Sequence, residues 1–145
     1  MKKLVRELMI PKSVKVLEND PIREVVVRIA EDRETMVACV VDEAGRLKGL
    51  ITPRELLREV EVREFGVTRY RFFGAELLHL LTSRYAKDIM SPPISVKPDD
   101  SVDKAITTML DNRFYEVPVV DAEGKVIGEI NYFGIIVGSV EALNR

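Results

Sequence analysis

The chain contains the same pattern twice. The run at residues 40–52, VVDEAGRLKGLIT, recurs at 119–131 as VVDAEGKVIGEIN, so the two copies are 79 positions apart here. Upstream, the apolar positions that begin with Ile22 and Val25 recur as Val102 and Ala105, 80 positions later. Such a repeat limits the fold to two like units, and pockets form where two like units meet.

Each repeat has roughly 55 residues, a size at which an isolated unit is only marginally stable. The whole chain has 145 residues, which suits one compact body. We therefore expect the two repeats to fold against each other and to share a core. The predicted division is residues 1–62 for the first repeat, 63–84 for a linker and 85–145 for the second repeat.

Composition indicates a soluble protein, since 46% of the residues are hydrophobic and 32% are charged. The net charge of −2 gives no general attraction to nucleic acids or acidic membranes. Cys39 is the sole cysteine and lies in an apolar run, so we expect a buried, inert thiol and a reducing compartment. Without a signal peptide or an 18-residue apolar run, a cytoplasmic location and no membrane partner are expected. The absence of Gln and Trp, beside many charged residues, resembles thermophile composition.

Each repeat is predicted to run strand, helix, strand, strand, helix, which is an α/β (α+β) fold. Apolar residues at helical spacing predict helices at about 21–31 and 101–112, with Asp20 as the N-cap of the first. Short apolar runs predict strands at 14–17 and 94–96 and hairpins at 37–51 and 117–130. The last helices are expected to begin at Pro53 and at about Tyr132.

The segment from Arg63 to Arg84 differs from both repeats. It holds the only histidine, His79, and it interleaves arginines with aromatics around Arg69–Phe73. A helix is predicted near Gly74–Leu81. Arginines beside aromatics can bind single-stranded nucleic acid, but the same composition is enriched at protein interfaces. We favour packing or an interface and disfavour nucleic-acid binding.

The order of elements, with Val117-Pro118-Val119-Val120-Asp121 and the Gly49-x-x-Thr52-x-x-Glu55 motif, resembles the CBS domain family. Tyr85–Pro92 is similar to the opening signature of that family, and Val5–Met9 is its partner in the first repeat. The resemblance implies a tandem pair, or Bateman module, that forms a pseudo-two-fold disc and associates as a homodimer. Members of the family commonly bind AMP, ADP, ATP or S-adenosylmethionine between the halves and regulate a partner protein without catalysis.

A carboxylate can accept hydrogen bonds from both ribose hydroxyls. The family places an Asp three residues after Thr for this purpose, and here Thr52 and Glu55 occupy these positions. The second repeat has Asn131 and Gly134 instead, so its cleft is expected to be degenerate. Thr52 and Glu55 also match a capping box, in which they serve only the helix, and Asn131 is a good N-cap in its own right. The sequence leaves both roles open.

The resemblance also suggests residues for the rest of the ligand. The candidate adenine slot consists of Ser13, Val14 and Ile51. The second cleft would contain Ile94, Ile130 and Asn131. The candidate phosphate contacts are Lys12, Arg54 and Arg113. The apolar members would equally serve as core strand. Glu116 stands where the family often has a basic residue, and it would repel a phosphate. A ligand with few phosphates is therefore favoured over ATP.

No catalytic constellation is present, since one histidine and one cysteine stand alone, and no Cys/His cluster predicts a metal site. No obligatory cofactor is expected. The sequence thus indicates a non-catalytic sensor that binds an adenosine-type ligand and regulates an unknown partner. The alternative is a scaffold with vestigial clefts that serves oligomerisation or protein interaction.

Overall fold

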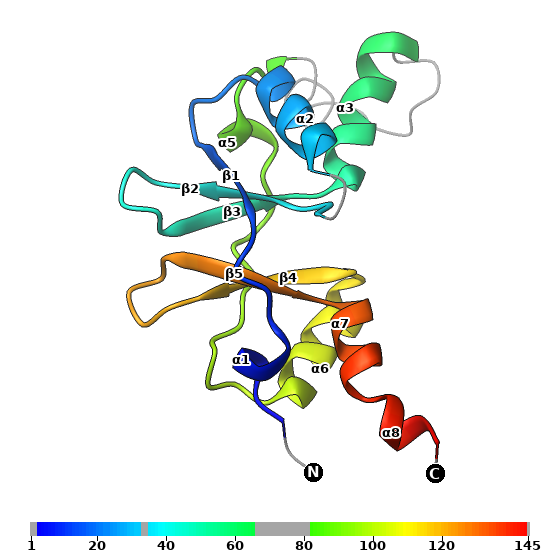
Figure 1. Ribbon diagram of the computed structural model, residues 1–145. Helices are drawn as coiled ribbons and strands as arrows, with labels where there is room; N and C mark the ends of the chain where they lie inside the picture. The colour runs from blue at the N-terminus through cyan, green and yellow to red at the C-terminus, as the bar shows by residue number, and fades with distance from the viewer. Residues whose placement is uncertain (1–2, 33–34, 66–81, 145) are drawn as a thin grey trace.

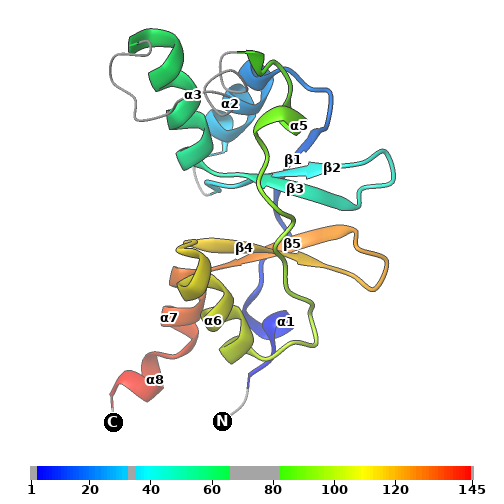
Figure 2. The same cartoon turned by 180° about the vertical axis from the view of Figure 1, so that it is seen from behind.

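The structure is a computed structural model that describes residues 3–32, 35–65 and 82–144. Two similar halves lie one above the other, with their sheets facing each other and their helices on the outer sides (Figure 1). Both chain ends lie at the outer end of the second half (Figure 2). The predicted α/β class with two like units is confirmed.

The first half contains a three-stranded sheet in the order β1-β2-β3, in which β1 is parallel and β3 antiparallel to β2. All four residues of β2 are buried, as expected for a central strand. Its elements are β1 (Val14–Leu17), α2 (Ile22–Glu31), β2 (Ala38–Val41), β3 (Leu47–Ile51) and α3 (Pro53–Phe65). Asp20 is not the N-cap of α2, because its carboxylate closes the preceding turn by accepting from Leu17 N at 2.8 Å.

The second half repeats this pattern with one strand fewer. Its elements are α6 (Val102–Asn112), β4 (Glu116–Val120), β5 (Val126–Asn131), α7 (Tyr132–Gly138) and α8 (Val140–Leu143). The predicted strand at 94–96 is reduced to a single parallel bridge between Val96 and Val119. Pro118 explains this difference, because it has no N–H to extend the ladder towards Ile94. Ser101 is the N-cap of α6 and accepts from Lys104 N at 3.1 Å.

The opening segments of the two repeats are exchanged between the halves. Helix α1 (Val5–Leu8) packs into the core of the second half, where Val5 is fully buried. Helix α5 (Ala86–Ile89) packs into the core of the first half, where Ala86 is fully buried. Backbone bridges follow the same exchange, since Ile10 pairs with Glu129 and Ser91 pairs with Leu50. Each half is therefore completed by the other repeat.

A third core joins the two sheets. It contains buried residues from both, namely Val37, Cys39, Val41, Leu50, Val120 and Val126. The two hairpin turns also meet, since Leu47 N donates to Gly124 O at 2.9 Å and Val126 N donates to Gly45 O at 3.1 Å. Both glycines have positive φ, +86° and +83°, which suits their turns. The predicted shared core is present in the structure.

The interior of the predicted linker, residues 66–81, lies outside the described residues, and so do its predicted helix and its Arg69–Phe73 cluster. Among the helices that the structure does describe, we find none with the length and apolar character needed to cross a membrane.

Candidate functional site

A cavity of about 390 Å³ opens between the two halves at the start of α3. We call it the Thr52 cleft. Its lining comes from both repeats: Met36, Val37, Thr52, Pro53, Arg54 and Glu55 from the first, and Ser91, Pro92, Ile94, Asn112, Arg113, Phe114, Tyr115 and Glu116 from the second. Most of its lining surface is apolar, with a few polar groups. Small-molecule pockets have this character.

Thr52 and Glu55 are hydrogen-bonded to each other at the start of helix α3. Glu55 Oε2 accepts from Thr52 N at 2.9 Å and also from the Thr52 hydroxyl. The predicted capping box is therefore half present, because the hydroxyl donates to the carboxylate and does not accept from the Glu55 N–H. Both bonds use one oxygen, so Glu55 Oε1 takes no part in the cap. The carboxylate is held in place by the helix start and still has an oxygen for a ligand.

Two arginines stand on the exposed rim of the Thr52 cleft. Arg54 follows the first residue of α3, and Arg113 ends α6 with a left-handed backbone at φ 57° and ψ 41°. Glu116 lines the same cleft but is buried, and its burial raises the pKa of its carboxyl group. The cleft thus has two cations at its edge and two acids, Glu55 at the start of α3 and the buried Glu116.

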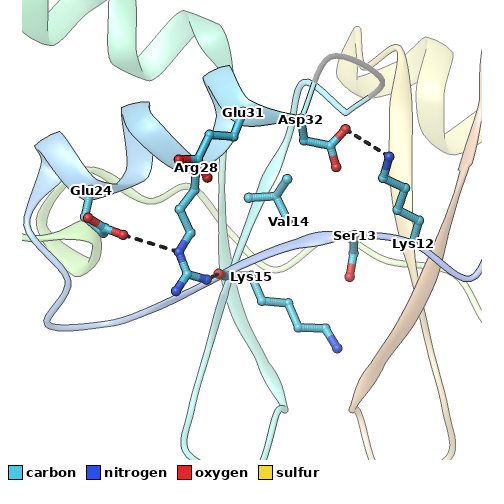
Figure 3. A pocket seen from close by; sticks show the side chains of 8 residues that line it. All are labelled: Lys12, Ser13, Val14, Lys15, Glu24, Arg28, Glu31 and Asp32. Atoms are coloured by element: carbon cyan, nitrogen blue, oxygen red, sulfur yellow. Dashed lines mark hydrogen bonds and ion pairs between the residues drawn. The ribbon is translucent and has the colours of Figure 1, made fainter.

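The residues predicted for the adenine slot do not all lie together. Ser13 and Val14 line a different, more open cavity of about 670 Å³, which we call the Ser13 cavity (Figure 3). Ile94, which the sequence places in the second cleft, lies in the Thr52 cleft instead. The exchange of opening segments explains the difference, because Ser91 N donates to Leu50 O at 2.7 Å, just ahead of Thr52. The Thr52 cleft therefore combines the helix start of the first repeat with the opening segment of the second, whereas all the residues that line the Ser13 cavity come from the first repeat.

Charged side chains in the Ser13 cavity largely pair with one another. Lys12 Nζ lies 3.3 Å from Asp32 Oδ1, and Arg28 donates to Lys15 O at 2.6 Å and contacts Glu24 at 3.5 Å (Figure 3). The side chain of Lys15 also lines this cavity and points away from the Arg28–Glu24 pair (Figure 3). Lys12, which is predicted as a phosphate contact, thus lines a different cavity from Thr52 and is already in an ion pair.

The three remaining candidate ligand residues, Ile51, Ile130 and Asn131, lie where they stabilise the fold. Ile51 and Ile130 are core residues with 0% and 1% of their surface exposed. Asn131 caps α7, with Oδ1 accepting from Gly134 N at 2.8 Å. The sequence left open whether these three residues bind a ligand or serve the fold, and their positions support a role in the fold.

Sequence reasoning missed a buried acid pair. Glu116 and Glu129 are 4% and 3% exposed, and they stand on neighbouring strands of the second half. Their equivalents in the first repeat, 79 positions earlier, are Val37 and Leu50. A comparison of the two repeats position by position could have found them, since acid replaces an apolar residue at both.

No group of three or more metal-binding side chains occurs in residues 3–32, 35–65 and 82–144. Cys39 is buried in the inter-sheet core, and its burial, with the charges of Glu129 and Glu116, raises the pKa of its thiol to about 12. The thiol is therefore not a nucleophile in the folded protein.

The two like halves and the cleft between them define a class of protein, and sequence comparison identifies that class. The family model described as CBS domain matches residues 5–62 and 86–137, so the chain belongs to the CBS domain family. Pairs of CBS domains are regulatory, non-catalytic modules.

Two curated relatives share part of their length with this chain. The magnesium transporter MgtE of Thermus thermophilus is 34% identical over 126 residues, which are 83% of this chain and 23% of the transporter. The CBS domain-containing protein CBSX1 of Arabidopsis thaliana chloroplasts is 26% identical over 110 residues, 67% of this chain and 47% of that protein. The chain thus spans less than half of each of these relatives.

Three solved structures show the same fold. A CBS domain-containing protein of Thermotoga maritima has a TM-score of 0.78 and 29% identity, with 96% of this chain and 95% of that chain covered. CBSX2 in complex with AMP has a TM-score of 0.77 and 22% identity, with 98% and 99% covered. The cytosolic domain of MgtE in complex with ATP has a TM-score of 0.69 and 28% identity, with 93% and 48% covered.

Proposed function

We propose that this protein is a regulatory module that binds an adenosine-type ligand in the Thr52 cleft. The single observation that carries the proposal is the Glu55 carboxylate. It is fixed by Thr52 at the mouth of an apolar cavity of about 390 Å³ that both repeats line. Related structures hold AMP or ATP, which supports the ligand class.

The ribose contact is assigned to Glu55. Its Oε2 accepts from Thr52, so the carboxylate is oriented before any ligand arrives. The Oε1 atom can then accept a ribose hydroxyl in a charge-assisted hydrogen bond. Capping and ribose binding, which the sequence left as alternatives, are compatible in this geometry because they use different oxygens.

The adenine ring is assigned to the apolar part of the cleft wall. Val37, Ile94 and Phe114 contribute this wall, one from the first repeat and two from the second. A ligand between them contacts both halves at once. Its binding energy can therefore favour one arrangement of the halves over another, which is what a sensor requires.

The charge distribution favours a ligand with few phosphates. Arg54 and Arg113 at the rim can pair with one phosphate group, while Glu116 disfavours further negative charge inside the cleft. We therefore propose AMP, adenosine or S-adenosylmethionine ahead of ATP. No obligatory cofactor is included in this proposal.

The partner surface is assigned to the outer helices. Large apolar side chains are exposed there, among them Leu57 on α3 and Phe133 and Val137 on α7, with 67%, 78% and 68% of their surface exposed. Such faces fit a homodimer of the kind that the family forms, or a regulated protein. This observation also supports the alternative function, a scaffold whose clefts hold no ligand.

Thermal unfolding of the whole chain with AMP, adenosine, ADP, ATP, S-adenosylmethionine and NAD separates these functions. A ligand at 100 times its dissociation constant adds about 2.7 kcal/mol to the free energy of unfolding, which shifts Tm by several degrees. We expect AMP, adenosine or S-adenosylmethionine to give the largest shift. No shift with any of the six compounds would overturn the sensor function and leave the scaffold.

A further inference from the structure

The buried acids of the second half connect the two repeats. Thr35 Oγ1 donates to Glu129 Oε1 at 3.1 Å, and Met36 N donates to Glu116 Oε1. Thr35 and Met36 belong to the first repeat and lie just before β2. The acid pair therefore links the two repeats by hydrogen bonds, in addition to the apolar core between the sheets.

The side chains of Glu116 and Glu129 are hydrogen-bonded to each other, and two carboxyl groups in such contact cannot both ionise without a large electrostatic cost. Burial, followed by the negative charge of Glu116, raises the pKa of Glu129 to about 8. Burial likewise raises the pKa of Glu116, although hydrogen bonds from the backbone of Met36 and Val37 oppose this effect. Near neutral pH the pair therefore holds a proton that it releases as the solution becomes alkaline.

Charged and titratable groups surround the pair from several elements. Asp32, after α2, raises the pKa of both carboxyl groups, and Lys12, before β1, lowers that of Glu129. Cys39 on β2 keeps its proton, and Lys15 acts on that thiol. Lys12 and Asp32 already form an ion pair with each other at 3.3 Å. The group left to change its charge near neutral pH is therefore the acid pair.

One member of the pair, Glu116, lines the proposed ligand site. Glu116 and its partner residue Met36 both line the Thr52 cleft, whereas Glu129 interacts with Lys12 and Asp32 of the Ser13 cavity. A proton gained or lost by the pair changes the negative charge inside the cleft. An anionic ligand responds to this change and a neutral one does not.

We propose that the Glu116–Glu129 carboxyl pair is a specificity determinant of the Thr52 cleft, which admits a phosphate-bearing ligand while the pair holds a proton and rejects it when both acids are ionised. This inference rests on the proposed function. It adds that recognition of the phosphate is linked to pH through two residues that stand where the first repeat has Val37 and Leu50.

The test compares AMP with adenosine on the whole chain by titration calorimetry at pH 7 and pH 9. The AMP phosphate is largely a dianion at both values, so its own ionisation contributes little. We expect AMP to bind roughly 10-fold more weakly at pH 9, in line with one additional buried charge nearby, while adenosine changes by less than about twofold. In Glu129→Gln the dependence of AMP binding on pH should disappear.

Two further variants complete the test. Glu129→Leu restores the residue type of the first repeat and should also abolish the pH dependence, so the test does not depend on the folding of one variant. Glu123→Gln removes an acid whose side chain is 72% exposed, and it should behave like the wild type. An equal response to pH in the wild type, Glu129→Gln and Glu129→Leu would overturn the inference but leave the proposed function intact. Failure of both AMP and adenosine to bind at either pH would overturn the inference, whereas only the absence of binding by all six compounds of the thermal-unfolding panel would overturn the proposed function.

Discussion

Gly128 is the position where a single added methyl group should most disturb the exchange of the opening segments. A Cβ atom at this residue would lie 2.2 Å from the Ile10 backbone oxygen and 2.8 Å from Met9 Cε. The first contact is with backbone and cannot be relieved by a rotamer change. Gly128→Ala must therefore push the segment that carries α1 away from β5.

The energetic cost follows from what this segment holds. Ile10 N donates to Glu129 O at 2.8 Å, and Glu129 N donates to Ile10 O at 2.9 Å. Each of these bonds contributes about 1 kcal/mol. Partial loss of the burial of Val5, which is fully buried, adds about 1 to 2 kcal/mol. We expect Gly128→Ala to lower the free energy of unfolding by about 3 kcal/mol.

Urea unfolding followed by circular dichroism measures this value, with Gly45→Ala as the matched control. Gly45 has φ +86°, and no atom lies within 4 Å of the position that its Cβ would take, so the control should cost only about 1 kcal/mol of backbone strain. If α1 detaches in the native state, the slope of unfolding against urea should also fall for Gly128→Ala. Equal midpoints for the two variants would refute the argument that the crossing requires glycine.

Three other expectations follow. Glu55→Ala should weaken adenosine binding roughly 10- to 100-fold, as loss of a charge-assisted bond implies, whereas Asn131→Ala should cost about 1 kcal/mol of stability and leave affinity unchanged; equal effects on affinity would contradict the assigned ribose contact. Because the pKa of Glu129 is raised, the stability it contributes is full below its ordinary pKa of 4.5 and is lost as the pH rises to about 8. Wild type should therefore lose about 2 kcal/mol relative to Glu129→Gln between about pH 5 and pH 9 in urea titrations, less than the full shift at about 1.4 kcal/mol per unit because Glu116 shares the proton; parallel profiles would contradict this. Cys39 should react with a thiol reagent at about pH 8 only after unfolding, because burial raises its pKa to about 12, and rapid labelling of native protein would contradict its buried position.

Most of the fold follows from the sequence because the repeat shows every element twice. The helix starting at Pro53 and the hairpins at 38–51 and 116–131 are where periodicity and turn residues predict them. The strand at 94–96 was overestimated, since Pro118 lies on the neighbouring strand and its effect on pairing is not local. Local sequence patterns predict which residues form a helix or a strand more reliably than they predict which strands pair with each other.

The site was predicted in part. Thr52, Glu55, Arg54 and Arg113 do line one cleft, and whether they bind ligand remains a prediction. Ser13 and Ile94 were grouped with the wrong clefts, because two similar repeats give no sign of which half an opening segment packs against. Steric fit decides this, and it depends on close approaches such as that of Ile10 to Gly128.

The exchange of α1 and α5 has a consequence for any attempt to divide the molecule. A cut within residues 66–81 would give two fragments, each of which carries a helix that belongs in the other's core. Neither fragment could bury its own apolar residues fully, yet each would present the groove that the other fills. The two fragments should therefore associate when mixed and restore the fold. The covalent connection between them would then be dispensable for folding.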